Sequence, residues 1–183
     1  TLKIQEGCNN NCTYCIIPSV RGPIRSRPVD EIRAEAERLA NAGFTELVLT
    51  DIHLTSYGRD FTPRQTLLDA IRAVQDVPGV RRIRLGSLEP TVATVEFAQA
   101  LRTMDKVCPQ FHLALQSGSD TVLQRMARRY NMRMYRQAME NLRAVYPMAA
   151  FTTDVLTGFP GETEAEFEET RAFIREARYA KIH

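Results

Sequence analysis

The sequence predicts an α/β fold in which parallel strands alternate with helices and the sheet curls into an incomplete barrel. Short runs rich in β-branched, aromatic and aliphatic residues recur along the chain, and longer helical patterns fill the gaps between them. Successive runs start roughly 30 to 40 residues apart, which is the length of one strand–helix unit. Polar and glycine-rich segments follow the runs, at the positions where barrels place their binding residues.

Six segments have the character of strands. They are residues 2–4, 44–50, 80–85, 111–115, 151–156 and, as an incomplete stub, 181–183. A helix between consecutive strands makes neighbouring strands parallel, and such right-handed connections curl the sheet. Five complete units and a stub are too few to close an eight-stranded barrel. We therefore expect a barrel that stays open on one side.

The helices carry recognisable start and stop signals. The first begins near Pro28, has acidic residues in its first turn, and ends before Gly43. The last opens with a capping box that runs from Thr163 to Glu166. The residues expected to face the core are Ile32, Ala36 and Leu39 in the first helix, and Phe167, Thr170 and Ile174 in the last.

Composition indicates one globular domain that spans residues 1–183. The hydrophobic fraction is 44% and the charged fraction 25%, and no apolar run approaches the roughly 20 residues that cross a bilayer. We expect a cytoplasmic protein that does not enter membranes. The net charge of +2 does not by itself indicate nucleic-acid binding. Two arginine clusters are either phosphate-binding or simply solvated: Arg21, Arg25 and Arg27, and Arg125, Arg128, Arg129, Arg133 and Arg136.

Three cysteines stand close together after the first predicted strand. Cys8, Cys12 and Cys15 follow a CxxxCxxC spacing, whereas Cys108 lies far along the chain. Three thiolates do not complete a four-ligand metal site, so a metal group held there keeps one coordination position free. That free position favours a chemical role over a structural one.

Other interpretations of the cysteines remain open. A closed zinc site needs a fourth ligand, and His53, His112 or Cys108 would have to fold back onto the three cysteines to supply it. A disulfide is the weakest interpretation, because a chain of 183 residues buries a core without covalent links. Free thiolates in a reducing compartment are ligands for iron.

The segment from Cys8 to Cys15, with Tyr14 before the last cysteine, resembles the cluster motif of the radical S-adenosylmethionine (SAM) enzymes. The resemblance implies that Cys8, Cys12 and Cys15 bind three irons of a [4Fe-4S] cluster and that SAM chelates the fourth. It further implies that the reduced cluster cleaves SAM to a 5′-deoxyadenosyl radical. The implied fold is a partial (βα)6 TIM-like barrel of the radical SAM type, open on one side to admit a large substrate.

Further segments resemble the methylthiotransferase branch of this superfamily. They are residues 7–28, 49–58, 82–90, 106–109, 115–120 and 154–163. Within the branch, 82–90 and 106–109 are most similar to the enzymes that modify N6-threonylcarbamoyladenosine. The resemblance implies that a methylthio group is added to carbon 2 of that nucleoside at position 37 of tRNA.

The resemblance also implies partners and further cofactors. The substrate is the tRNA anticodon loop, an electron donor such as a flavodoxin reduces the cluster, and the protein is a monomer. Enzymes of this branch carry a second [4Fe-4S] cluster in an N-terminal domain and an RNA-binding C-terminal domain. Neither lies within these 183 residues, so we expect a radical SAM core that does not complete methylthiolation alone.

Three candidate cofactor contacts lie on the first and third of these segments. Tyr14 is expected to touch the SAM adenine, as the resemblance implies, although an aromatic residue in a loop needs no such role. Ser87 and Glu89 follow the third strand and are candidates to contact the ribose or methionine of SAM. Alternatively they cap the next helix. Pro90 directly follows Glu89 and restricts where that side chain points.

Four more candidates follow later strands. Gln116 and Ser117 supply polar groups beside a glycine, where SAM contact and plain turn chemistry are both reasonable. Gly158 lies in a tight loop that leads to a helix N-terminus and is either a cofactor contact or a simple turn. Arg128 is a candidate to pair with the SAM carboxylate or an RNA phosphate, or is merely exposed.

Four residues have less certain roles. Asp51 and His53 stand where the family often has Gly and Asn, so substrate contacts there are in doubt, and His53 is a minor candidate cluster ligand. Cys108 is expected to be a small buried hydrophobic residue at the opposite end of the barrel. Asp154 is expected to join a structural polar network.

Three alternatives to the main hypothesis remain. The first is a sibling enzyme that acts on isopentenyladenosine of tRNA or on an aspartate of a ribosomal protein. The second is a zinc-stabilised binding module without catalysis. The third is an inert fragment that loses an exposed cluster in air.

Overall fold

The structure, a computed structural model, describes all residues from Thr1 to His183. Seven short strands lie in two parallel sheets. The first has the order β1-β4-β5, and the second has the order β6-β7-β8-β9. Their bounds are β1 Leu2–Lys3, β4 Glu46–Thr50, β5 Arg82–Leu85, β6 Ser87–Leu88, β7 Gln110–Leu113, β8 Ala150–Thr153 and β9 Lys181–Ile182.

The two parallel sheets are the halves of one curved sheet. Only Gly86 separates β5 from β6, so a single stretch of chain pairs first with β4 and then with β7. The Gly86 amide donates to Leu49 O at 2.9 Å, and a Cβ on Gly86 would lie 3.1 Å from that oxygen. Glycine is favoured at so close a backbone approach. The sheet bends here, which confirms the predicted partial barrel with all six of its predicted strands.

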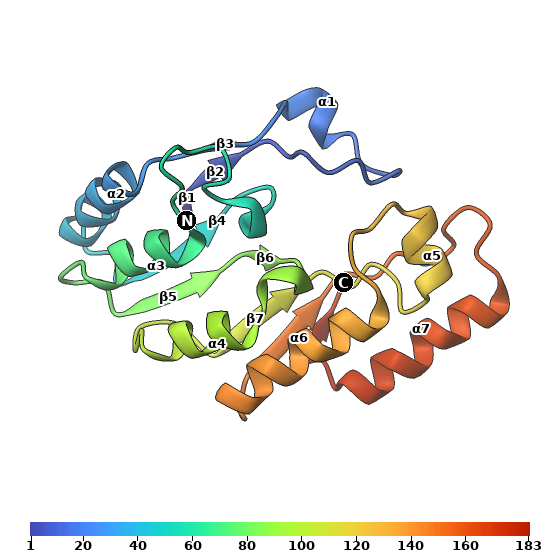
Figure 1. Ribbon diagram of the computed structural model, residues 1–183. Coiled ribbons are helices and arrows are strands. Elements are labelled where there is room, and N and C mark those ends of the chain that lie inside the picture. Colours follow the sequence, from blue (N-terminus) through green and yellow to red (C-terminus); the bar gives the residue numbers. More distant parts are fainter.

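Helices cover the outer side of this sheet. Figure 1 shows α2, α3, α4, α6 and α7 following one another from the left of the view through its lower part to the right. Helix α1 lies at the top of the view, and α5 lies at the right, above α7. The bounds are α1 Ile17–Arg21, α2 Val29–Asn41, α3 Leu67–Gln75, α4 Val95–Arg102, α5 Asp120–Arg125, α6 Met132–Val145 and α7 Glu164–Ala177, with short 3-10 turns η1 Leu54–Ser56 and η2 Pro90–Val92. None of these helices combines the length and apolar character needed to cross a bilayer.

The predicted helix ends are confirmed at α2 and α7. Helix α2 begins directly after Pro28, and α7 opens with the capping box between Thr163 and Glu166. The buried face of α7 differs from the prediction. Thr170 is buried as expected, but Phe173 and Ala177 are buried where Phe167 and Ile174 are only half-buried. The buried stripe of α7 is therefore centred on Phe173, because that side chain packs edge-on against Tyr135 of α6.

An antiparallel pair of strands closes the base of the segment that carries the three clustered cysteines. Strand β2 (Gln5–Glu6) pairs with β3 (Arg25–Ser26), and residues 7–24 between them form what we call the cysteine loop. Just inside this pair, the Cys8 amide donates to Gly22 O at 3.1 Å. The sequence pattern did not predict this clamp. It holds both ends of the cysteine loop against the barrel.

Gly7 is the residue in the clamp that tolerates substitution least. Its φ is +73°, and a Cβ there would lie 2.0 Å from the Pro23 carbonyl oxygen. We expect Gly7→Ala to separate the two strands and to lower the free energy of unfolding by about 1–3 kcal/mol. Urea titration measures this cost. Gly43→Ala is the matched control: its φ is +90° but nothing lies within 4 Å of the added Cβ. Equal losses in both variants would contradict the proposed clash.

Candidate active site

A cavity opens at the carboxyl ends of the strands, where the segments after β2, β4, β5 and β7 meet. The three cysteines of the cysteine loop line it. Five of the seven other predicted site residues line the same cavity, namely Tyr14, Ser87, Glu89, Gln116 and Arg128. Parallel strands bring their carboxyl ends to one rim, so residues far apart in sequence meet there.

The three cysteines of the cysteine loop face one cavity, where they could hold a metal group together. All three thiols are free and partly buried. No three Cys, His, Asp or Glu side chains in the chain converge closely enough to share one ion. Three free thiols on one cavity are the donors that iron–sulfur clusters use. Burial raises the pKa of the Cys8 thiol, and the Asn10 amide, which donates to its sulfur at 3.4 Å, opposes that shift.

Of the three candidate fourth ligands for a closed zinc site, His53 lines the cysteine cavity, whereas Cys108 and His112 do not. Cys108 lies at the amino-terminal end of β7, among Arg84, Lys106 and their neighbours, at the opposite end of the barrel. It is half-buried rather than fully buried. His112 contacts Asp154 at 3.2 Å from Nε2. Neither Cys108 nor His112 therefore reaches the cysteine loop, and a fourth protein ligand from them is ruled out by position.

Arg128 is the hub of the cavity. Its Nη2 donates to Glu89 Oε1 at 2.8 Å, and its Nη1 lies 3.1 Å from Cys12 Sγ and 3.4 Å from the Tyr14 hydroxyl. The guanidinium stacks over the Tyr130 ring at 4.9 Å from its centre. Burial favours the neutral form, but the adjacent Tyr130 and Glu89 raise the pKa of Arg128 above its ordinary value. The alternative that Arg128 is merely exposed is wrong, since only 8% of its side chain is accessible.

Glu89 is the acid that Arg128 faces, and 7% of its side chain is exposed. Asn10 Nδ2 donates to Oε1 at 3.2 Å, and the Glu89 amide donates to Thr55 Oγ1 at 2.9 Å. His53 Nε2 lies 3.0 Å from Oε2, a contact that does not have the geometry of a hydrogen bond. Burial raises the pKa of Glu89, but the contacts with His53 and Arg128 have a larger combined effect. The pKa of Glu89 is therefore lowered. The η2 turn has no side-chain cap, so Glu89 does not cap it.

Tyr14 bounds the cavity from the cysteine loop, and Gln116 bounds it from the segment after β7. The Tyr14 ring is partly exposed and meets Phe159 edge-on, with ring centres 6.5 Å apart. Gln116 has a φ of +64°, rare for a residue with a side chain, and its amide donates to Asp154 O at 2.9 Å. Strained backbone of this kind concentrates at functional sites.

The structure does not bring Ser117 and Gly158 to the cavity. Ser117 is fully buried, with its hydroxyl 3.2 Å from that of Thr170 on α7. A Cβ on the neighbouring Gly118 would lie 2.6 Å from Thr170 Cα, so close packing against α7 explains this glycine. Gly158 is exposed, and its amide donates to Glu162 at 2.6 Å within the loop before α7. Turn and packing chemistry account for both positions.

Sequence reasoning missed Asn10 and gave His53 only a minor place. Asn10 is buried, lines the cavity and contacts Glu89. Its position between two cysteines, within the run Asn9–Asn11, was the available signal. His53 also lines the cavity, and its Nδ1 lies 2.8 Å from Ser56 Oγ. Asp154 contacts both His112 and His183, in agreement with a structural network.

Asp51, directly after β4, should make stability depend on pH. Burial raises the pKa of Asp51 to about 8, against donation by the Leu54 amide. The Gln5 amide is oriented so that both its oxygen and its nitrogen are hydrogen-bonded. Its nitrogen then donates to Asp51 Oδ2 at 2.7 Å, and this hydrogen bond offsets part of the rise in pKa. The folded chain thus binds this proton more tightly than the unfolded chain, so the free energy of unfolding falls as pH rises from about 4 to 8.

Asp51→Asn removes this titration. We expect the variant to gain about 1–3 kcal/mol relative to the parent chain between pH 5 and pH 8, since one pKa unit corresponds to about 1.4 kcal/mol. Urea unfolding at several pH values measures the difference. Parallel pH profiles for the two proteins would show that Asp51 titrates normally.

Comparison with known proteins agrees with this geometry. The sequence model of the radical SAM superfamily matches residues 2–174. The chain belongs to the radical SAM superfamily. A structure of the radical SAM methyltransferase TsrM from Kitasatospora setae aligns with 99% of the chain and 35% of its own length, with a TM-score of 0.78 and 19% identity. Methylornithine synthase (PylB) aligns with 96% of the chain and 49% of its own length, with a TM-score of 0.66 and 15% identity. Both similarities support the radical SAM fold.

Two curated relatives of this radical SAM chain modify tRNA. Threonylcarbamoyladenosine tRNA methylthiotransferase MtaB of Bacillus subtilis (strain 168) is 44% identical over 183 residues, which are 100% of this chain and 41% of the relative. A tRNA-2-methylthio-N(6)-dimethylallyladenosine synthase of Clostridium botulinum (strain Hall / ATCC 3502 / NCTC 13319 / Type A) is 39% identical over 176 residues, 96% of this chain and 39% of the relative. The chain thus spans about two fifths of these relatives.

Membership in the radical SAM superfamily implies a [4Fe-4S] cluster and SAM as cofactors. The cavity has donors suited to both. Its three free thiols suit iron, and Tyr14, Glu89 and Arg128 place an aromatic ring and a buried charge pair beside them.

Proposed function

We propose that this chain is the radical SAM core of a tRNA methylthiotransferase that acts on N6-threonylcarbamoyladenosine. The observation that carries the proposal is the common cavity of Cys8, Cys12 and Cys15 at the open end of the barrel. Sequence identity of 44% to a threonylcarbamoyladenosine methylthiotransferase over the whole chain supports the choice of reaction and nucleoside.

In this proposal the cavity divides into a metal side and a nucleotide side. Cys8, Cys12 and Cys15 hold the cluster by three corners and leave one iron free for the amino and carboxylate groups of SAM. When bound, the cluster and SAM supply a 5′-deoxyadenosyl radical able to remove hydrogen from an unreactive C–H bond. Tyr14 offers a ring face for the adenine, and the polar side chains of Ser87 and Gln116 lie within the same cavity.

Arg128 and Glu89 position this site. The guanidinium reaches Cys12 Sγ and the Tyr14 hydroxyl at once, so it ties the cysteine loop to the barrel wall. Its positive charge also favours the anionic thiolate that binds metal. His53 and Arg128 hold the pKa of Glu89 below its ordinary value, and its carboxylate, which also accepts from Asn10, is available to polar groups of the cofactor.

We infer that the substrate is position 37 of tRNA, where a methylthio group replaces the hydrogen on carbon 2 of the adenine. A base in a single-stranded anticodon loop is reached by unstacking it, which costs little there. In this scheme an electron donor such as a flavodoxin reduces the cluster, a second [4Fe-4S] cluster in another domain takes part in sulfur insertion, and the core acts as a monomer.

Anaerobic reconstitution followed by iron and sulfide counting is the first test. The proposal expects one [4Fe-4S] cluster per chain and 5′-deoxyadenosine after addition of dithionite and SAM. Stoichiometric zinc with no cluster would contradict it. Mass spectrometry of tRNA then tests the nucleoside: threonylcarbamoyladenosine, and not isopentenyladenosine, should gain the methylthio group once the second-cluster domain is supplied. Full product from the chain alone would show that no second domain is needed.

A further inference from the structure

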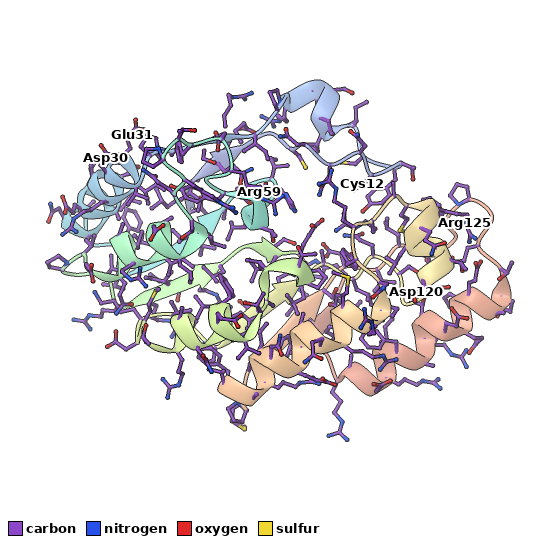
Figure 2. All side chains as sticks on the ribbon, viewed as in Figure 1. Cys12, Asp30, Glu31, Arg59, Asp120 and Arg125 are labelled. Carbon is purple, nitrogen blue, oxygen red and sulfur yellow. The ribbon has the colours of Figure 1, made fainter.

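A second cavity adjoins the active site on the side away from Tyr14. Asn10 and His53 line both cavities, so the two share one wall. The lining of the second cavity is almost entirely polar and includes Arg59 and Arg129. Arg59 follows η1, and Arg129 directly follows the hub residue Arg128. Figure 2 shows Arg59 on the same upper side of the molecule as Cys12.

Neither of the two arginines forms an ion pair with an acid of the chain. Arg59 takes part in no ion pair and no side-chain hydrogen bond, and Arg129 makes only a 3.5 Å contact from Nη2 to Asn9 O. Arg128 and Arg125, by contrast, are each paired with a glutamate. Free guanidinium groups that face a cavity are binding groups for anions, because their planar donors match carboxylate and phosphate oxygens.

The acidic side chain in this second cavity does not cancel the charge. Asp60 lines the cavity, but its carboxylate oxygens accept from the Ser26 amide at 2.8 Å and the Ser26 hydroxyl at 2.6 Å. Asp60 is thus engaged with β3 and supplies one negative charge against two positive ones. Arg129 is also close enough to Glu89 to help lower the pKa of that carboxyl. Its field therefore reaches the active site.

We propose that Arg59 and Arg129 form an anion-binding subsite for the substrate nucleotide. Asn10 and His53, which line both cavities, lie between this subsite and the active site. The anion is a carboxylate or a phosphate. This assignment rests on the proposed function: the anion is the carboxylate of the threonylcarbamoyl group, which is attached to N6 of the adenine. An isopentenyl group carries no charge and gains nothing from this subsite. The two arginines would therefore select between the nucleosides of the two kinds of relative.

Binding of free nucleosides to the cluster-reconstituted full chain with SAM tests this subsite without turnover. Isothermal titration calorimetry compares N6-threonylcarbamoyladenosine with its neutral methyl ester, and adenosine 5′-monophosphate with adenosine. We expect the acid to bind about tenfold more tightly than the ester, the effect of one charge-assisted contact. Arg59→Gln and Arg129→Gln should each reduce this ratio several-fold, and the double variant should abolish it.

Arg64→Gln is the matched control, because Arg64 is an exposed arginine of the same segment and does not line the cavity. It should keep the acid-to-ester ratio of the parent chain. The proposal would be overturned by no binding of any of the four ligands or by an acid-to-ester ratio unchanged in the double variant. Equal binding of acid and ester together with equal binding of adenosine and its monophosphate would also overturn it. A preference for the monophosphate, with equal binding of acid and ester, would overturn the carboxylate assignment and give the subsite to a phosphate. If the subsite fails while mass spectrometry still finds methylthiolated threonylcarbamoyladenosine, the proposed function stands without it.

Discussion

Replacement of Cys12 by alanine is expected to reduce bound iron and sulfide by about an order of magnitude after anaerobic reconstitution. Cys8→Ala and Cys15→Ala should do the same. Each thiol lines the same cavity, so each replacement removes one of the three protein attachments expected for the cluster. The visible absorbance of the cluster should fall together with the iron content, and 5′-deoxyadenosine formation should be lost.

Cys108→Ala is the matched control for this experiment. Cys108 is also a free, half-buried thiol, but it lies at the opposite end of the barrel beside Pro109 and β7. It should retain the full iron content. Loss of iron in Cys108→Ala, or normal iron in Cys12→Ala, would contradict the assignment of the three cysteines as the cluster ligands.

The second large effect is expected from Arg128→Met. This change leaves the Glu89 carboxylate buried without its cation, and removal of one partner from a buried ion pair typically costs about 3–5 kcal/mol. Only 8% of the Arg128 side chain and 7% of the Glu89 side chain are exposed. Methionine keeps much of the side-chain volume over Tyr130, so the loss reports mainly on charge. Urea unfolding of the metal-free chain measures the cost.

Two variants control for this result. In Glu89→Gln combined with Arg128→Met no charge is left unpaired, so the double variant should be more stable than Arg128→Met alone. Arg125→Met breaks the bidentate pair with Glu166, which is more exposed, and its effect should be clearly smaller. If Arg128→Met destabilises the chain no more than Arg125→Met does, the buried Glu89–Arg128 pair contributes no more to stability than the more exposed Arg125–Glu166 pair.

Much of the architecture could be predicted because it depends on local patterns. Alternation of short apolar runs with amphipathic segments defined all six main strands, and capping signals located the starts of α2 and α7. The predicted end of the fifth strand was less accurate. Residues 151–156 were predicted to continue as one strand, but β8 ends at Thr153 and only an isolated bridge at Val155 follows.

Site residues could be predicted where their motif lies just after the end of a strand. Tyr14, Ser87, Glu89 and Gln116 reach the predicted rim because the carboxyl end of each parallel strand is there. Ser117 directly follows Gln116 yet faces α7 and not the cavity. Its direction depends on the positive φ of Gln116 and on the close approach of Gly118 to Thr170, neither of which a strand pattern contains.

The amino-acid sequence by itself determined the order of strands and helices, the spacing of the three thiols and the rim on which polar loops gather. These features follow from residue periodicity and from the geometry of parallel strands, which act over short stretches of chain. The tertiary structure alone decided the β2–β3 clamp, the bend at Gly86, the pairing of Glu89 with Arg128 and the meeting of Arg59 with Arg129. Each depends on contacts between residues far apart in the chain, which form only when the whole barrel packs.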